Sequence, residues 1–341
     1  MTDYVTLAVD AMGGDNAPKM VIEGINCSLT NHENVKFLVF GDSKELLPLF
    51  SKFPQLEKVS EIRHTEDIVT NNDKVAHALR SGRNSSMRLA IDAVSTHDAD
   101  GIISAGNTGA LMAMAKFVLK TLPGITRPAI AAHIPTMIGQ SLMLDLGANI
   151  ACDAKNLVQF AVMGEVLARQ VAGLENPSVG ILNVGEEDLK GMESVKEAAS
   201  ILQNTSLPIK FHGFIEGDDI TAGIVDVIVT DGFTGNIALK TAEGTAKMFG
   251  LFLREAFQSS PLAMFGSRLA KRSLLKFKSR LDPRTYNGAM LLGLNGICVK
   301  SHGGSDSLSF SNAIGVAINL IRTNLNENIK KDYSRVHDDK N

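Results

Sequence analysis

The sequence predicts an α/β protein with three layers, α/β/α, around a mostly parallel sheet, together with a helical extension. Short apolar runs rich in Val and Ile alternate with stretches of helical periodicity along most of the chain. Such alternation implies parallel strands joined by right-handed crossovers. Several apolar runs end in glycine beside Asp, Asn, Ser or Thr, where a strand would turn into a helix. Because ligands of open α/β sheets collect at such strand ends, the pattern also predicts a polar site.

The composition limits the class of protein. With 341 residues, 44% of them hydrophobic, and 30 glycines, the chain suits one two-lobed α/β catalytic domain over residues 1–330. A net charge of −3 argues against general nucleic-acid binding. The three cysteines lie far apart without a CxxC pair, which suits a reducing cytosol. No basic leader opens the chain and no apolar run approaches the roughly 18 residues of a membrane span, so we expect a cytoplasmic protein.

The first third of the chain alternates from its start. Val5 to Val9 is a strand-like run, and after a glycine turn a helix is expected from about Pro18 to Leu29. The elements expected next are a strand at 35–40, a helix at 43–53, a strand at 59–63, and a helical region at 73–94 interrupted at 81–86.

Two extended runs beyond residue 100 indicate an antiparallel hairpin. Ile130 to Ile134 and Ser141 to Leu146 flank a turn at Thr136 to Gln140. The other elements expected are a strand at 102–104, a helix ending near 122–124, a helix at 157–171, strands at 179–182, 210–214 and 224–229, and helices at 235–256 and 308–325. The charged tail, residues 331–341, is expected to fray.

The stretch from Val227 to Lys240 reads as a buried strand that turns through glycines into a helix. Thr234 is the expected N-cap of a helix that begins at Gly235 or Asn236. Unpaired amide groups at such a helix start favour negative charge. The same order of apolar strand, Ser/Thr-x-Gly-x-Thr-Gly and helix recurs at Ile102 to Leu111. Two such turns can frame one polar ligand from two sides.

Glycines also follow the first strand. Gly13 and Gly14 would let the backbone approach a ligand closely, although the third glycine of a dinucleotide fingerprint is missing. Asp10 and Asp15 either hold a metal or a substrate, or only stabilise the turn through local hydrogen bonds. Both interpretations stay open.

Two basic side chains stand near expected strand ends. Lys190 follows a run of acids and precedes a glycine, which favours a role in the site over a place on the surface. His302 is a candidate general base or anion donor, and a structural histidine at a strand end is the competing interpretation.

A basic amphipathic extension is expected over residues 258–285. Its leucines and phenylalanines fall on one side of a helical wheel. Its basic residues include Arg268, Lys271, Arg272, Lys276, Lys278 and Arg280. Such a stretch suits an acidic protein partner or an anionic membrane surface. A helix with one face in the core and a solvated basic face is the alternative.

The sequence contains no pattern typical of a zinc site, a Walker loop or a serine nucleophile elbow. The polar groups at the strand ends instead suit a phosphate together with an acyl or other electrophilic partner. We therefore expect neither a metal nor a cofactor.

Nearly the whole chain resembles the bacterial phosphate acyltransferase (PlsX) family of phospholipid synthesis. The resemblance rests on Asp10-Ala-Met-Gly-Gly-Asp15, Ser104-Ala-Gly-Asn-Thr-Gly-Ala-Leu-Met112, Arg127-Pro-Ala129, Leu144-Asp-Leu-Gly-Ala-Asn149, Gln159-Phe-Ala-Val-Met-Gly164, Leu182-Asn-Val-Gly-Glu-Glu187, Asp231-Gly-Phe-Thr-Gly-Asn236, Tyr286-Asn-Gly-Ala289 and Val299-Lys-Ser-His-Gly303. The chain departs from the family pattern at His212-Gly-Phe214 and at Ile150 to Ala154, after Asn149.

The resemblance implies a fold like that of isocitrate and isopropylmalate dehydrogenases, a homodimer, and transfer of a long acyl chain from acyl-carrier protein to inorganic phosphate. The acyl phosphate would pass to a glycerol-3-phosphate acyltransferase in the membrane, with peripheral membrane association of this protein. By hypothesis, the residues that cradle phosphate are Ser104, Asn107, Thr108, Thr234, Gly235 and Asn236. Lys190 would supply charge, and Asn236 or His302 would face the thioester carbonyl. The other substrate-side candidates are Asp10, Gly13, Gly14 and Asn149.

Two other functions remain open at this point. One is a metal- and NAD-dependent oxidoreductase of the same fold, which the missing nucleotide fingerprint and the lack of a clear carboxylate cluster disfavour. The other is a non-catalytic scaffold for a carrier protein or a membrane. Fold analogy alone cannot choose among these.

Overall fold

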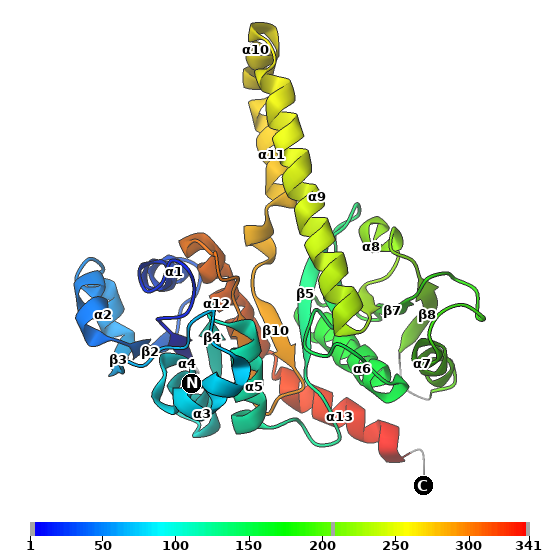
Figure 1. Cartoon of the computed structure of the whole chain (residues 1–341), viewed down its shortest axis with the longest axis horizontal. Coiled ribbons are helices and arrows are strands. Elements are labelled where there is room, and N and C mark those ends of the chain that lie inside the picture. Colours follow the sequence, from blue (N-terminus) through cyan, green and yellow to red (C-terminus); the bar gives the residue numbers. More distant parts are fainter. Residues whose placement is uncertain (1–3, 206–208, 339–341) are drawn as a thin grey trace.

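The computed structural model describes residues 4–205 and 209–338 and shows two lobes that share one sheet (Figure 1). Within these residues the sheet has 11 strands in the order β3-β2-β1-β4-β11-β10-β5-β6-β9-β7-β8. The strands are β1 Val5–Asp10, β2 Val35–Gly41, β3 Ser60–His64, β4 Gly101–Ser104, β5 Ala129–Pro135, β6 Gln140–Leu144, β7 Ser178–Leu182, β8 Lys210–Ile215, β9 Val227–Val229, β10 Ala289–Leu292 and β11 Ile297–Lys300.

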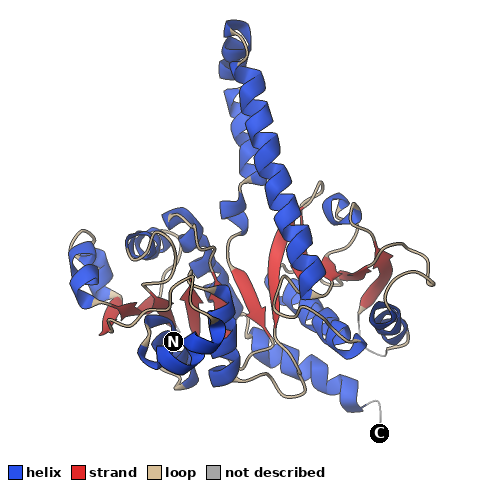
Figure 2. Cartoon of the chain, viewed as in Figure 1, coloured by secondary structure: helices blue, strands red, loops and turns tan. Residues whose placement is uncertain are grey.

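Helices cover both faces of the sheet and separate the parallel strands (Figure 2). The α-helices are α1 Lys19–Ser28, α2 Ser43–Phe50, α3 Val75–Ser81, α4 Ser86–Ser95, α5 Thr108–Leu119, α6 Ala154–Val171, α7 Glu193–Gln203, α8 Asp219–Ala222, α9 Gly232–Gln258, α10 Pro261–Leu269, α11 Lys271–Leu281, α12 Ser307–Arg322 and α13 Leu325–Asp338. Short 3-10 helices are η1 Pro54–Lys58, η2 Gly82–Asn84 and η3 Pro283–Tyr286. The predicted α/β class with a mostly parallel sheet is confirmed.

The core is split by the sheet into two apolar layers. On one face, Ile22 of α1, Phe160 of α6 and Ile314 of α12 pack together and are fully buried. On the other face, Ile91 of α4 and Leu111 of α5 do the same. Complete burial of a Leu, Ile or Phe side chain stabilises the fold by roughly 1.5–3 kcal/mol, so these layers hold the sheet rigidly beneath its loops.

Antiparallel strands in the middle of the sheet reverse its direction between the lobes. Strands β3, β2, β1, β4 and β11 are parallel neighbours, and so are β6, β9, β7 and β8. Between these groups, β11–β10, β10–β5 and β5–β6 are antiparallel, the last being the predicted hairpin. The strands of the two parallel groups therefore run in opposite directions. The carboxyl ends of one group lie on the same side of the sheet as the amino ends of the other group.

Helix α9 begins earlier than predicted. Its N-cap is Asp231, whose side chain accepts a hydrogen bond from the backbone N–H of Thr234, and the helix starts at Gly232. Thr234 lies in the first helical turn and is not the N-cap. Asp is as good an N-cap as Thr, and the glycines that we took for a turn are helical residues.

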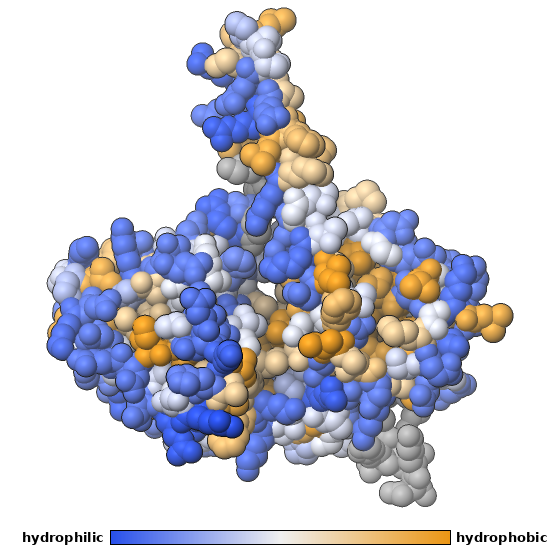
Figure 3. Space-filling view, in the orientation of Figure 1, coloured by the Kyte–Doolittle hydropathy of each residue, from blue (hydrophilic) through white to orange (hydrophobic). Residues whose placement is uncertain are grey.

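The predicted basic extension is a helical hairpin that projects from the body of the molecule (Figure 1). Helix α9 leads outward, and the expected single amphipathic stretch is divided at Ala270 into α10 and α11, which lead back. The rings of Phe249 in α9 and Phe277 in α11 lie 6.4 Å apart, so the two arms pack together. Figure 3 shows apolar residues along one flank of the hairpin and hydrophilic residues along the other. No helix in the described part of the chain has the length and apolar composition needed to cross a membrane.

The end of the chain does not fray where we expected. Helix α13 continues to Asp338 and packs on α6. Gln159 donates a hydrogen bond to the buried Tyr333 hydroxyl at 2.7 Å, and Arg169 forms an ion pair with Asp332. These polar contacts hold α13 in place after Lys330. The structure does not describe residues 339–341 of the predicted tail.

Candidate active site

A buried hydrogen-bonded cluster joins the strand ends of the first lobe. Asp10, at the end of β1, accepts hydrogen bonds from the hydroxyls of Ser86 and Ser104, both at 2.6 Å. Burial raises the pKa of the Asp10 carboxyl, and the two serine hydroxyls oppose this rise. Because Ser104 ends β4 and Ser86 begins α4, one carboxylate holds three elements together. Asp10 and Ser104 are fully buried, so they shape the site from beneath its surface.

The peptide between Ala105 and Gly106 is held at both of its polar groups. The backbone N–H of Gly106 donates to the Ser104 hydroxyl at 3.0 Å, and the Ala105 carbonyl accepts from Lys300 Nζ at 3.2 Å. Gly13 packs against this peptide so closely that a Cβ there would lie 2.7 Å from the Gly106 nitrogen. The glycine turn predicted after β1 therefore serves close backbone packing in the first lobe.

Helix α5 starts directly after this peptide, and its N-cap side chain is fully engaged. Asn107 Oδ1 accepts from the Ala110 N–H at 3.1 Å. Its amide group donates to three backbone carbonyls of the neighbouring loop, those of Thr70, Asn71 and Asp73. The predicted phosphate contact of the Asn107 side chain is thus replaced by a structural role. Thr108 is exposed at the helix start, where N–H groups favour an anion.

A second buried carboxylate organises the strand ends of the second lobe. Asp145, directly after β6, accepts hydrogen bonds from the N–H groups of Ile130, Gly147, Ala148 and Asn149 and from the Asn149 side chain. The Asn149 amide also donates to the Pro128 carbonyl at 2.8 Å. Burial raises the pKa of Asp145, although these donors favour its charged form. Asn149 is nearly buried and supports the loop.

The start of α9 is pressed against this loop. The Gly232 N–H donates to the Asn149 carbonyl at 2.7 Å, and a Cβ on Gly235 would lie 2.0 Å from the Asp145 carbonyl oxygen. The Thr234 hydroxyl donates to Asp231 at 2.7 Å, which completes the N-cap. Gly235 is thus required for close packing, and the Thr234 hydroxyl is occupied within its own turn.

Helix α9 carries a row of polar residues along one of its faces. Residues at spacings of three and four share a helix face, and the polar ones that follow one another in this way are Asn236, Lys240, Glu243 and Lys247. Lys240 acts electrostatically on both Lys300 and His302 of the first lobe. Asn236, one turn or roughly 6 Å before Lys240, therefore lies on the face that turns toward the first lobe. Asn236 is exposed.

His302 follows β11 at the edge of the first lobe and has the geometry of a donor. Burial and the charges of Lys240, Lys300 and Lys247 lower its pKa, while Glu243 raises it, so the ring is neutral at pH 7. Its Nδ1 accepts the Gly304 N–H at 3.1 Å, which leaves the proton of the neutral ring on Nε2. His302 can therefore donate a hydrogen bond to an anion through Nε2.

Lys190 lies in an exposed loop that follows β7. Its Nζ is 2.8 Å from a carboxylate oxygen of Glu187, and this hydrogen bond raises the pKa of Lys190. Asn183 holds the base of the loop by donating to the carbonyls of Gly185 and Lys190 at 3.0 and 3.1 Å. The structure thus places Lys190 in the loop that follows β7, with its ammonium turned to the neighbouring acid Glu187.

Sequence analysis missed Lys300, Asp145 and Ser86 as residues of the site. Lys300 is only 7% exposed, and burial lowers its pKa to about 8. A lysine at the end of the apolar run that forms β11 was the available signal, and Asp145 stands in the same position after β6. Ser86 carries no such signal, because its role depends on α4 packing beside β1.

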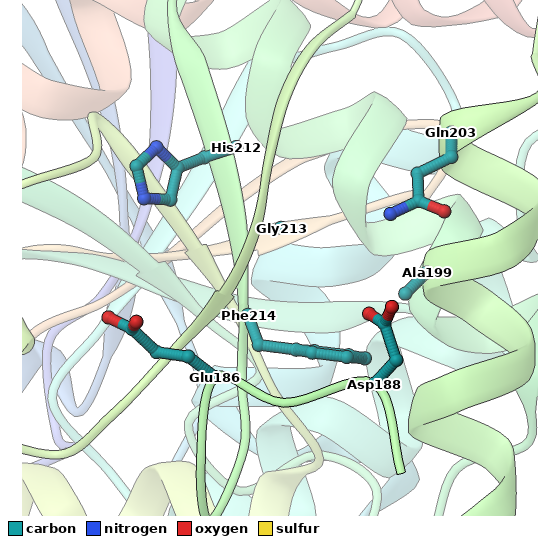
Figure 4. A pocket seen from close by; sticks show the side chains of 7 residues that line it. All are labelled: Glu186, Asp188, Ala199, Gln203, His212, Gly213 and Phe214. Atoms are coloured by element: carbon teal, nitrogen blue, oxygen red, sulfur yellow. The ribbon is translucent and has the colours of Figure 1, made fainter. Parts of the chain in front are cut away.

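An open pocket of ≈ 270 Å³ lies at the outer edge of the second lobe (Figure 4). It is lined by Glu186, Asp188, Ala199, Gln203, His212, Gly213 and Phe214. The pairing of β7 with β8 skips His212, which forms a β-bulge at the place where the chain departs from the family pattern. None of the predicted catalytic residues lines this pocket, and we assign the site to the α9 face instead.

One group of side chains in the described residues resembles a metal site, formed by Asp42, His64 and Glu66 in the first lobe. Lys44 Nζ lies 2.7 Å from a Glu66 carboxylate oxygen, and His64 Nδ1 accepts from the Ser43 N–H. An ammonium already compensates this acid, and the exposed cluster has the contacts of an N-cap and a surface ion pair.

Comparisons with known proteins identify the family of this chain. Residues 5–328 match the family described as fatty acid synthesis protein. The phosphate acyltransferases of Paramagnetospirillum magneticum and Rhodospirillum centenum are 57% and 58% identical over 336 residues, which cover 98% of this chain and 96% and 95% of those proteins.

Two solved structures share the fold at low sequence identity. The EutD phosphotransacetylase from Staphylococcus aureus has a TM-score of 0.60 at 18% identity and covers 95% of this chain and 94% of its own. A phosphotransacetylase from Streptococcus pyogenes has a TM-score of 0.61 at 16% identity, with 94% of both chains covered. The two relatives named above are phosphate acyltransferases. The chain therefore belongs to the fatty acid synthesis protein family, and it is an acyltransferase that acts on phosphate.

Proposed function

We propose that this acyltransferase moves a long-chain fatty acyl group from acyl-acyl-carrier protein to inorganic phosphate. The product, an acyl phosphate, would serve phospholipid synthesis through a glycerol-3-phosphate acyltransferase in the membrane. The observation that carries the proposal is the single face of α9, on which Asn236 lies one turn before Lys240, a cation that acts electrostatically on Lys300 and His302. An amide donor and several cations beside one space suit a phosphate that meets a carbonyl.

Direct attack of phosphate on the thioester fits the available groups. Phosphate is already anionic near neutral pH, so it needs positioning and partial desolvation more than a strong base. The bond that forms joins a phosphate oxygen to the acyl carbon, and the bond that breaks releases the carrier's thiolate. A thiolate is a good leaving group, and no covalent acyl-enzyme is needed.

The tetrahedral intermediate develops negative charge on the former carbonyl oxygen. A well-placed amide or N–H donor typically stabilises such an oxyanion by about 3 kcal/mol. Asn236 is exposed on the face of α9 that carries Lys240, and His302 has its Nε2 proton available for a hydrogen bond. We assign the oxyanion to Asn236, with His302 as a second donor, and the phosphate to the start of α5.

The assay for the whole proposal uses palmitoyl-acyl-carrier protein and radiolabelled phosphate. Purified protein should form a labelled product that is stable to acid but cleaved by hydroxylamine, as expected for an acyl phosphate. Folded protein that leaves both substrates unchanged would contradict the acyl donor that we propose. A nicotinamide-binding assay tests the oxidoreductase alternative, for which the relatives give no support.

Replacing Lys190 by alanine should slow acyl phosphate formation by about tenfold to a hundredfold. A hydrogen bond from an ammonium to an anion contributes about 1.5–3 kcal/mol, and this contact forms only when Lys190 leaves Glu187 for phosphate. Initial rates at saturating phosphate measure the effect.

The matched control for this change is Lys196→Ala. Lys196 lies 2.8 Å from Glu193, a glutamate three residues earlier, as Glu187 is for Lys190. Equal rates for Lys190→Ala and Lys196→Ala would mean that Lys190 is a surface residue with no role in the reaction.

The hairpin is the proposed contact for the acidic carrier protein. Arg268 in α10 and Lys271, Arg272 and Lys276 in α11 are exposed; the side chains of Lys278 and Arg280 lie outside those described. A pocket of ≈ 340 Å³ between the arms is lined by Arg254, Phe257, Gln258, Met264, Ser267 and Arg268. Basic groups beside apolar ones also suit an anionic membrane surface, which supports peripheral membrane association.

Reversing two of these charges, with Arg268→Glu and Arg272→Glu together, should weaken carrier binding by about tenfold or more at low salt. The loss should shrink as salt rises, because screening removes the attraction in both proteins. Fluorescence anisotropy with labelled carrier protein measures it, and vesicles with and without anionic lipid test the membrane separately. The control reverses Lys52 and Lys58, exposed lysines of the first lobe. If affinity for both the carrier protein and the anionic vesicles were unchanged, the basic flank of the hairpin would be a solvated surface without a binding role.

The apolar flank of the hairpin is the proposed dimer contact. The exposed apolar residues of the hairpin include Leu251, Phe252, Leu262, Phe265 and Leu269. A contiguous apolar surface of this kind marks an interaction site, and a second copy of the chain would cover it. Light scattering should give twice the chain mass of 36.5 kDa, and a monomer would contradict this contact.

A further inference from the structure

Five large apolar side chains are exposed at the strand ends of the second lobe. Ile150 follows β6, Phe233 and Ile237 follow β9, and Val184 and Leu189 follow β7. Their exposed fractions run from 49% for Ile237 to 92% for Leu189. Single exposed apolar residues are normal on a protein surface, whereas a group of them marks a binding site. Figure 3 shows hydrophobic residues gathered on the second lobe at the base of the hairpin.

The fold brings these residues to one edge of the sheet. Strands β6, β9 and β7 are parallel neighbours in that order, so the segments that follow them leave the sheet side by side. The Gly232 N–H donates to the Asn149 carbonyl at 2.7 Å, which ties the start of α9 to the loop after β6. Ile150 and Phe233 thus each directly follow one partner of a hydrogen bond, and the two side chains leave the backbone close together.

Asn236, the proposed oxyanion donor, adjoins this group of apolar residues. It lies three residues after Phe233, and helix residues three or four apart are neighbours on the helix surface. Ile237 is four residues after Phe233 and continues the same face. The Asn236 side chain also lies against the loop that leads to Ile150, since a Cβ on Gly147 would be 3.7 Å from the Asn236 Cβ. A substrate whose carbonyl meets Asn236 therefore has apolar side chains directly beside that carbonyl.

We propose that Ile150, Val184, Leu189, Phe233 and Ile237, here called the strand-end apolar surface, bind the hydrocarbon chain of the acyl donor and determine which chain length is preferred. The surface is continuous with the reacting carbonyl, and an acyl group carries its hydrocarbon on that carbon. Each methylene that leaves water strengthens binding by up to about fourfold, so several apolar side chains in a row favour long acyl groups over short ones. The assignment rests on the proposed function for the identity of the donor.

The first test measures kcat/KM with palmitoyl- and butyryl-acyl-carrier protein and takes the ratio of the two values. Wild-type protein should favour the palmitoyl donor by about a hundredfold or more. The double change Phe233→Ser and Ile237→Ser should lower the ratio by about tenfold or more, because two apolar contacts of the long chain are lost. Damage to the fold or to the reacting groups would lower both values and leave the ratio unchanged. The ratio therefore reports the chain contact alone.

The matched control is Leu47→Ser together with Leu174→Ser. Both leucines are exposed, one in α2 of the first lobe and the other after α6 in the second lobe. This control should keep the wild-type ratio. A ratio that is unchanged by Phe233→Ser with Ile237→Ser, or that falls equally in the control, would overturn the proposal.

The second test needs no reaction and uses dansyl-labelled undecanoic acid as the probe, below the concentration at which it forms micelles. Its fluorescence should rise on binding to wild-type protein, and palmitate should displace it where butyrate does not. The Phe233 and Ile237 variant should bind the probe about tenfold or more weakly than the control variant. If its affinity for the probe is normal and light scattering shows a lower mass instead, the surface is a contact between copies of the chain and the proposal is wrong.

Failure of the proposed function would look different. If wild-type protein makes no acyl phosphate but binds the probe through Phe233 and Ile237, the strand-end apolar surface still takes a hydrocarbon chain and the proposed reaction is wrong. If acyl phosphate forms and the chain-length ratio is the same in both double variants, the reaction stands and the acyl chain lies elsewhere.

Discussion

Asn236→Ala is expected to lower kcat for acyl phosphate formation by about a hundredfold or more. Loss of one oxyanion donor typically costs about 3 kcal/mol in the transition state, and the ground-state carbonyl gains much less from the same contact. KM for both substrates should therefore change little. Because Asn236 is exposed and alanine is a better helix former, the fold should be at least as stable as in wild type.

The control for this prediction is Thr245→Ala in the same helix. Thr245 is exposed nine residues later, on the opposite face of α9, so its replacement should leave kcat unchanged. Asn236→Asp gives a second check, since a carboxylate of the same size would repel the oxyanion and should be at least as slow as alanine. If the rate of Asn236→Ala lay within about threefold of the wild-type rate, Asn236 would not be the main oxyanion donor, and His302 would take that assignment.

Most elements of the fold could be predicted from the sequence because each depends on its own residues. Apolar runs such as Val5 to Val9 and the periodic stretch at 157–171 show the period of the structure that they form. The interruption at 81–86 was also visible, as a cluster of turn residues, and the structure breaks there between α3 and α4.

The relation between the lobes could not be predicted in this way. We expected the polar residues at the carboxyl ends of the strands to surround one ligand, as in other open α/β sheets. The antiparallel pairs of β5 with β10 and β6 reverse the second group. The hairpin of β5 and β6 was predicted, but the pairing of β10 with β5 joins residues far apart in sequence. Only the observed course of α9 brings Lys240, one turn after Asn236, within electrostatic reach of His302. The roles of Lys300 and Asp145 were hidden for the same reason, since burial of a strand-end charge depends on its neighbours.

The motif that contains Gly232 and Gly235 was recognised from the sequence, but the local structure predicted for these glycines was wrong. Glycine is unfavourable inside a helix, so we placed the helix start after Gly232 and at or beyond Gly235. Both are helical in the structure, and both face the loop from Asp145 to Asn149. Glycine lowers the stability of the helix at both positions, but no larger residue fits there between the helix and the loop.

Gly235→Ala is therefore expected to destabilise the protein by about 3 kcal/mol or more. An added Cβ would lie 2.0 Å from the Asp145 carbonyl oxygen, which is backbone and cannot rotate away. The Asp145 N–H also donates to the Thr230 carbonyl, and its carboxylate holds the same loop, so a shift would break several hydrogen bonds. Overpacking of a rigid contact typically costs about 1–3 kcal/mol, and this contact is closer than most.

Gly244→Ala provides the opposite sign within the same helix. Nothing lies within 4 Å of the position that its Cβ would take, so the change should stabilise α9 by about 0.8–1 kcal/mol through helix propensity alone. Urea unfolding followed by circular dichroism measures both variants. If Gly235→Ala also gained stability, the loop at Asp145 would have to be free to move, and the rigid placement of Asn236 beside it would no longer hold.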